Sequence, residues 1–208
     1  AAERLVVGDP NRIADVLETP FSILDPSQPK PLPEKRRGLV EFHDVDFRYP
    51  DAEKDVLQDI SFTAEPGQTT AIIGSTGSGK STLVNLLPRF FDVTKGKITL
   101  DGVDIRELTQ HDLRDQIGYA PQRGLLFSGT VESNLRVGAP NASEEEMRQA
   151  VTSAQAADFV FDEGDGLAME IAQGGSNVSG GQKQRLSIAR ALIKKPPVFI
   201  FETLFLLS

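Results

Sequence analysis

One run of eight residues constrains this chain more than any other: Gly74–Ser81, which reads GSTGSGKS. The run satisfies the pattern G-x-x-x-x-G-K-[ST] at every constrained position. An apolar, β-prone stretch, 69–73, precedes it, and a helix-like run, 81–87, follows it. The sequence therefore predicts a buried strand, a glycine-rich loop and a helix in direct succession.

That succession predicts a binding site for a nucleoside triphosphate. Glycines let the loop, which we call the P-loop (Gly74–Ser81), wrap closely and aim its N–H groups at one point. The helix start adds unpaired N–H groups and a partial positive charge. We expect Lys80 to reach the outer phosphates and the Ser81 hydroxyl to help hold Mg²⁺. The alternative is a plain Gly/Ser-rich turn, which the flanking strand and helix disfavour. The expected nucleotide contacts are Gly74, Ser75, Thr76, Gly77, Ser78, Gly79, Lys80, Ser81 and Thr82.

The composition is that of a globular protein and narrows the possible partners. The 208 residues are 39% hydrophobic and 25% charged, with a net charge of −8. This balance argues against a nucleic-acid partner, although one cluster of N–H groups and a lysine suffices for ATP. The absence of cysteine excludes disulfides and cysteine-ligated metals. Because no stretch has the unbroken apolar length of a membrane span, we expect the chain itself to be soluble.

The chain divides into an N-terminal linker, 1–38, and a main domain, 39–208. The linker holds a predicted helix, 10–17, and closely spaced prolines that exclude a long one. The predicted strands of the domain are 39–49, 58–64, 69–73, 97–100, 117–121 and 198–201, and its predicted helices are 79–87, 143–154 and 179–193. Ser143 and the glutamates after it predict a capped helix start. This alternation predicts an α/β fold around a parallel sheet, with an antiparallel edge formed by the first two strands.

A second anion-binding helix start is predicted at Ser179–Gln182. Ser179 has the chemistry of a helix N-cap, and Gly180 and Gly181 open the long helix that follows. Uncapped N–H groups at such a start attract anions. A capped helix with a flexible entry is the alternative, and the P-loop upstream favours the anion site.

With both helix starts, the chain from Leu39 onward resembles the ATP-binding-cassette (ABC) ATPases. Ser179, Gly180, Gly181 and Gln182 are similar to the signature motif of that family. Segments 126–131 and 172–175, together with the N-terminal linker, resemble exporter-type members. The resemblance implies a P-loop NTPase fold with a parallel core sheet, an antiparallel β subdomain and a helical signature subdomain.

Two further residues resemble functional positions of these ATPases. Tyr49 is similar to the aromatic residue that stacks on adenine, and an ordinary edge-strand aromatic is its alternative reading. Gln122 resembles the glutamine that contacts Mg²⁺ and the attacking water, and a plain loop glutamine is the alternative. The resemblance thus implies ATP and Mg²⁺ as cofactors.

The resemblance also implies partners and a location. In such ATPases the P-loop of one subunit and the signature motif of another sandwich ATP, so the second partner is another ABC ATP-binding domain, in a homodimer or heterodimer. A transmembrane domain is the other implied partner. The parent protein would lie at the cytoplasmic face of the cell membrane and couple ATP hydrolysis to export.

The pattern breaks at the end of the chain. Glu202 stands where the family has an aspartate that holds Mg²⁺ through water, and Thr203 stands where a glutamate polarises the attacking water. Threonine cannot act as a carboxylate base. The expected metal positions are Ser81, Gln122 and Glu202, and the expected catalytic positions are Gln122, Glu202 and Thr203. We therefore expect ATP binding with little hydrolysis.

The unusual ending also leaves the origin of residues 202–208 open. A shifted reading frame or an added tail would explain residues 202–208, and the domain would then be incomplete at its C-terminus. A genuine short relative is the alternative. A non-transport ABC ATPase of DNA repair or chromosome structure is a further alternative function, disfavoured because no long insertion separates the two motifs.

Overall fold

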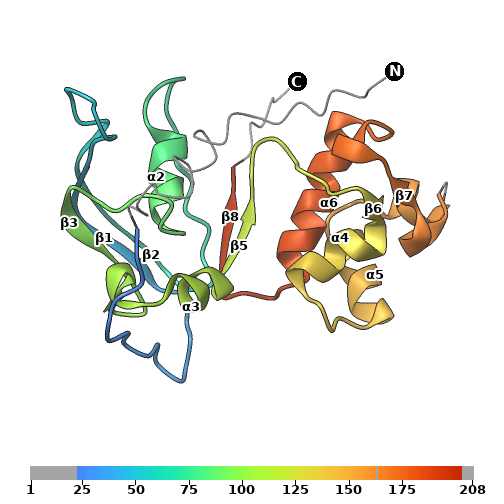
Figure 1. The fold of residues 1–208 in the computed structure, drawn as a ribbon, viewed down its shortest axis with the longest axis horizontal. Coiled ribbons are helices and arrows are strands. Elements are labelled where there is room, and N and C mark those ends of the chain that lie inside the picture. The colour runs from blue at the N-terminus through green and yellow to red at the C-terminus, as the bar shows by residue number, and fades with distance from the viewer. Residues whose placement is uncertain (1–22, 163, 203–208) are drawn as a thin grey trace, which may run out of the picture.

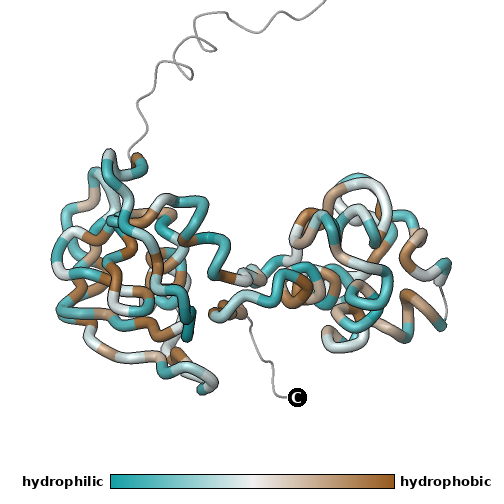
Figure 2. Tube along the Cα trace, turned by 90° about the horizontal axis from the view of Figure 1, so that it is seen from below, coloured by the Kyte–Doolittle hydropathy of each residue, from teal (hydrophilic) through white to brown (hydrophobic). Residues whose placement is uncertain are grey.

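The computed structural model describes residues 23–162 and 164–202. Two lobes lie on either side of a pair of strands (Figure 1). We call them the sheet lobe, which contains β1–β4, α2 and α3, and the helical lobe, which contains α4–α6, β6 and β7. Each lobe has its own cluster of buried apolar side chains, and Figure 2 shows apolar residues inside both. The predicted helix 10–17 and Thr203 lie outside the described residues.

The sheet lobe is built on a four-stranded antiparallel sheet in the order β2-β1-β3-β4. Its strands are β1 (Val40–Phe47), β2 (Leu57–Ala64), β3 (Lys95–Leu100) and β4 (Val103–Asp104). Buried apolar side chains in β1 alternate with more exposed ones, which is the pattern of a half-buried strand. The helices α2 (Lys80–Leu86) and α3 (Gln110–Asp115) complete the lobe. The predicted antiparallel edge is confirmed.

Between the lobes, β5 (Ile117–Ala120) and β8 (Val198–Phe201) form a parallel pair. The register pairs Ile117 with Val198 and Ala120 with Phe201, so both strands end at the same edge. The predicted parallel sheet is confirmed in this pair. However, the strand β8 is less buried than its apolar sequence suggests, because Phe199 and Phe201 are 40% and 48% exposed.

The predicted buried strand 69–73 is wrong. The described structure has no strand there, and these residues are exposed, with Ile73 at 92%. A buried strand needs neighbouring strands for its N–H and C=O groups and an apolar cover for its side chains. The parallel pair β5–β8 does not include this segment, so its apolar sequence alone does not place it in a sheet.

The helical lobe gathers α4 (Val131–Gly138), α5 (Glu144–Ser153) and α6 (Gly180–Leu192) around one apolar cluster. The short strands β6 (Gly129–Thr130) and β7 (Glu170–Ile171) pair beside them. Short helical turns lie at 105–107, 158–162, 166–168 and 173–175. Each of the three long helices begins with a capping box, headed by Thr130, Ser143 or Ser179. The predicted caps at Ser143 and Ser179 are therefore confirmed.

In the part of the chain that the structure describes, no helix combines the length and the apolar character needed to span a membrane.

Candidate functional site

The P-loop needs glycine at two positions where it enters α2. Gly77 and Gly79 have φ angles of 83° and 85°, in the left-handed region that other residues adopt at a cost. A β-carbon on Gly79 would also stand 2.9 Å from Cδ2 of Leu57. The left-handed backbone therefore favours glycine at position 79, and a β-carbon there would also crowd the Leu57 side chain of β2.

Lys80 holds its ammonium group over the loop. Its Nζ donates hydrogen bonds to the carbonyl oxygens of Gly74 and Ser75, both at 2.7 Å. It also lies 3.4 Å from the hydroxyl oxygen of Ser78. Gly79, which precedes the first residue of α2, has no side chain that can cap the helix start. A positive charge and a helix start without a side-chain cap therefore lie together, which is a suitable arrangement for an anion.

Tyr49, which follows β1 of the antiparallel sheet, contacts the helix α2. Its hydroxyl oxygen lies 3.0 Å from Oγ1 of Thr82. The rings of Phe47 and Phe91 meet the Tyr49 ring edge-on, with centroids 4.9 and 5.2 Å away. Thr82 is only 7% exposed, and the contact with Tyr49 gives its buried hydroxyl a hydrogen-bond partner. Tyr49 is thus held in one orientation beside the P-loop helix.

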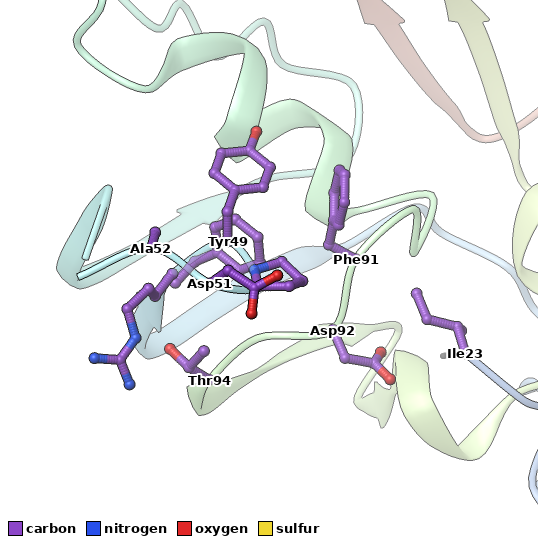
Figure 3. Close-up of a pocket in the computed structure, with 10 residues that line it drawn as sticks. Ile23, Tyr49, Asp51, Ala52, Phe91, Asp92 and Thr94 are labelled. Carbon is purple, nitrogen blue, oxygen red and sulfur yellow. The ribbon is translucent and has the colours of Figure 1, made fainter. Parts of the chain in front are cut away.

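A hollow of about 510 Å³ opens beside Tyr49. Figure 3 shows the rings of Tyr49 and Phe91 rising on one side of it and Asp92 and Thr94 on the other. Ile23 contributes to the lining from the described start of the chain. An aromatic ring beside a partly apolar hollow is suited to stacking with a flat ring system.

The parallel pair brings Gln122 and Glu202 to one edge. Gln122 lies two residues beyond β5, Glu202 follows β8 directly, and the Glu202 N–H donates to the Ala120 carbonyl at 3.0 Å. Glu202 Oε2 also accepts a hydrogen bond from the hydroxyl of Tyr119, at 3.0 Å. Burial raises the pKa of Tyr119 to about 12, with help from the hydrogen bond and the charge of Glu202. The Tyr119 hydroxyl therefore keeps its proton at neutral pH.

Sequence reasoning missed Tyr119 and its second contact, Asn85. The Tyr119 hydroxyl is 3.0 Å from Oδ1 of Asn85, which lies in α2. One local signal was present, because Asn85 follows Ser81 by four residues and therefore shares its helix face. The position of Tyr119 in the middle of an apolar strand gave no comparable signal.

Ser81 in α2, together with Gln122 and Glu202 at this edge, has oxygen donors of the kind that suit a Mg²⁺ ion with bound phosphate. Ser81 and Gln122 are exposed, and Glu202 supplies one carboxylate, so all three offer hard oxygen ligands. No group of three or more His, Asp or Glu side chains within 23–162 and 164–202 forms an all-protein metal cage. Mg²⁺ typically takes one or two carboxylates and completes its shell with phosphate oxygens and water.

The second predicted anion site lies in the helical lobe. The Ser179 hydroxyl accepts from the Gln182 N–H at 3.3 Å, and Gln182 Oε1 accepts from the Ser179 N–H at 2.8 Å. Gly180 and Gly181 are exposed, and a β-carbon on either would meet nothing within 4 Å. Packing inside this chain therefore does not require these glycines, and they leave the helix start open to close approach.

The two predicted anion sites do not lie together. The P-loop precedes α2 in the sheet lobe, and Ser179–Gln182 opens α6 in the helical lobe, beyond β5 and β8 (Figure 1). The loop after β5 provides a connection, because a β-carbon on Gly124 would stand 2.5 Å from the carbonyl oxygen of Lys183 in α6. The loop that carries Gln122 is thus packed against the helix that begins at the second site.

Comparison with known proteins agrees with this arrangement. The family model described as "ABC transporter" matches residues 57–202. An uncharacterized ABC transporter ATP-binding protein of Mycobacterium tuberculosis is 50% identical over 197 residues, which cover 93% of this chain and 34% of that protein. A beta-(1→2)glucan export ATP-binding/permease protein, NdvA, of Rhodopseudomonas palustris is 49% identical over 170 residues, covering 82% of this chain and 28% of NdvA.

A solved structure has a similar fold. The structure of a bacterial Atm1-family ABC exporter with ATP bound superposes with a TM-score of 0.83 and 37% sequence identity, covering 91% of this chain and 33% of that one. The chain therefore spans about a third of the length of the relatives that it matches.

Proposed function

Since the chain belongs to the ABC transporter family, we propose that it binds Mg²⁺-ATP as the ATP-binding domain of an exporter. The observation that carries this proposal is the position of Lys80. Its ammonium group lies over a loop that two left-handed glycines turn into the start of α2. The P-loop N–H groups and Lys80 would hold the phosphates, and Tyr49 would stack on the adenine.

Two of the three metal positions lie at the edge of the parallel pair, and the third lies in the P-loop. We assign the Ser81 hydroxyl, the Gln122 amide and the Glu202 carboxylate to Mg²⁺. The ion would supply positive charge to the phosphate oxygens. Glu202, held by the Ala120 carbonyl and the Tyr119 hydroxyl, would orient one carboxylate at this position.

The partners follow from the separation of the two anion sites. The open glycines of Ser179–Gln182 would meet the P-loop of a second ABC ATP-binding domain, with ATP between the two chains. The match to fused ATP-binding/permease proteins supports a transmembrane domain as the other partner and the cytoplasmic face of the membrane as its location. Residues 39–208 would be the ATP-binding domain and residues 1–38 the linker to that partner.

We further propose that this chain hydrolyses ATP slowly. Thr203 offers no carboxylate to polarise a water, and Glu202 reaches one methylene further than aspartate. Each effect lowers the rate of the chemical step while leaving the phosphate site in place. The intact parent transporter would couple ATP hydrolysis to export.

A paired assay tests this function. Binding of mant-ATP, a fluorescent ATP analogue, should be clear for this chain and should weaken at least tenfold in Lys80→Ala, which removes a charged contact to phosphate. Phosphate release should be slow, and should rise in a variant carrying Glu202→Asp and Thr203→Glu. Unchanged affinity in Lys80→Ala would contradict the site, and equal turnover in both chains would contradict the proposed slow hydrolysis.

A further inference from the structure

Three side chains from three elements meet where β5 and β8 end beside α2. Tyr119 belongs to β5, Asn85 to α2, and Glu202 directly follows β8. The Tyr119 hydroxyl oxygen lies 3.0 Å from Asn85 Oδ1 and 3.0 Å from Glu202 Oε2. These partners are 34 and 83 residues away in the sequence, so only the tertiary fold brings them together.

Tyr119 has a single hydroxyl proton, and this determines the direction of the hydrogen bonds among the three side chains. A phenol has one proton, and an ionised carboxylate can only accept, so Tyr119 donates to Glu202. The Tyr119 oxygen then accepts from Asn85, which requires the amide nitrogen, rather than the oxygen, to face the hydroxyl. The two ends of an amide have the same shape, so this exchange needs no movement of the chain. With the amide in that orientation, the hydrogen bonds would run in one direction, from Asn85 to Tyr119 and from Tyr119 to Glu202, and we call this chain the relay.

The relay links Glu202 to the helix of the P-loop. Asn85 lies one helical turn after Ser81, on the same face of α2. The Tyr119 ring is fixed by Phe90, whose ring meets it edge-on with a centroid distance of 5.9 Å. The guanidinium group of Arg114 lies over the Phe90 ring in turn, 5.5 Å from its centroid. Packing against Phe90 therefore fixes the Tyr119 ring, and with it the position of the hydroxyl that donates to Glu202.

Resting on the function proposed above, we propose that Tyr119 is a positioning residue that sets the Glu202 carboxylate toward Mg²⁺. A glutamate has one more rotatable bond than the aspartate of related chains, and ordering that bond costs entropy. A charge-assisted hydrogen bond from Tyr119 selects one orientation. Asn85 ties that orientation to α2, which also presents Ser81 at the same site.

The test compares mant-ATP affinity in Mg²⁺ with affinity in EDTA, using the full chain. The Mg²⁺ enhancement is the ratio of the two dissociation constants. Tyr119→Phe keeps the ring and removes the hydroxyl, so the enhancement should fall about tenfold while affinity in EDTA stays within about twofold. Glu202→Gln should lower the enhancement as well, and Tyr119→Phe should add nothing further in that background, because the two residues act together.

Tyr49→Phe is the matched control, because its hydroxyl also contacts α2, through Thr82, but does not contact Glu202. It should change affinity equally in Mg²⁺ and in EDTA. Should Tyr119→Phe not fold, Asn85→Asp gives a second measurement, because an acceptor in place of the amide donor breaks the relay and should also lower the enhancement. In the wild type, the Asn85 side-chain ¹⁵N–H signal should show a hydrogen bond.

Each contrary outcome has a distinct meaning. An unchanged enhancement in Tyr119→Phe, or equal losses in Mg²⁺ and EDTA, would overturn the role of Tyr119 while leaving ATP binding intact. Binding of mant-ATP that does not respond to Mg²⁺ in the wild type would overturn the metal assignment of Glu202 and with it the role of Tyr119. A wild-type chain that does not bind mant-ATP would overturn the proposed function itself.

Discussion

Gly124 lies so close to the backbone of Lys183 that a β-carbon would stand 2.5 Å from the Lys183 carbonyl oxygen. Gly124 belongs to the loop after β5, and Lys183 belongs to the first turn of α6. A second contact strengthens this junction, because Arg190 donates to the Leu125 carbonyl at 2.7 Å. Displacement of the Gln122 loop would therefore act directly on the helix that begins at Ser179–Gln182.

We expect Gly124→Ala to destabilise the chain by about 1–3 kcal/mol, because the added methyl group meets backbone atoms that cannot turn aside. Urea unfolding followed by circular dichroism measures the loss. Gly180→Ala is the matched control, since a β-carbon there meets nothing within 4 Å, and its stability should equal or exceed that of the wild type. Equal stability of Gly124→Ala and the wild type would refute the close contact.

The contact between Tyr49 and Thr82 predicts coupled losses of stability. Tyr49→Phe and Thr82→Val should each cost about 1 kcal/mol, because each leaves the other hydroxyl without its 3.0 Å partner. The double variant should lose clearly less than the sum of the two, since no partner is then left unsatisfied. Thermal or urea unfolding of the four chains measures this, and strictly additive losses would contradict a hydrogen bond.

Glu146 predicts a specific acid response. Its hydrogen bond to Lys195, together with the Ser143 cap, lowers its pKa from the usual 4.5 to about 2. A carboxylate with a lowered pKa adds stability above pH 4.5, and this stability is lost as the pH falls from about 4.5 to about 2. Glu146→Gln should therefore flatten the stability profile in that window. Lys195→Gln, which removes the side chain that donates to Glu146, should also flatten the profile, and a wild-type profile in Glu146→Gln would refute the assignment.

The open glycines of the signature segment predict a selective loss of assembly. Gly181→Asp should keep the fold and the affinity for mant-ATP, because Gly181 is exposed and a β-carbon there meets nothing within 4 Å. It should abolish ATP-dependent dimer formation, since it blocks close approach and places a negative charge near phosphate. Analytical ultracentrifugation with and without ATP measures this. Lys80→Ala should lose both the nucleotide and the dimer, and a Gly181→Asp chain that dimerises normally would contradict the shared site.

Local sequence patterns were sufficient where the physical cause is local. The P-loop glycines at 77 and 79 adopt the left-handed backbone that the motif implies, and Lys80 lies over the loop as expected. Ser143 and Ser179 cap their helices through contacts only three residues away. The strands at 117–121 and 198–201 were also predictable from their apolar runs, whereas their pairing with each other is seen only in the structure.

Local sequence patterns could not predict features that depend on residues far away in the sequence. The apolar stretch 69–73 suggested a buried strand, yet its burial depends on neighbouring strands, which the described structure does not place beside it. Tyr119 looked like one more residue of an apolar strand. Its importance depends on Asn85 and Glu202, which lie in two other elements.

The residue order alone specifies which groups are available: the P-loop with Lys80, a capped second helix start, and Glu202 followed by Thr203. These are local matters of backbone preference, capping and side-chain chemistry. The fold sets how these groups lie relative to one another, because such contacts depend on close approach between elements far apart in the chain. It placed the two anion sites in different lobes, packed Gly124 onto α6, and tied Glu202 to the P-loop helix through Tyr119 and Asn85.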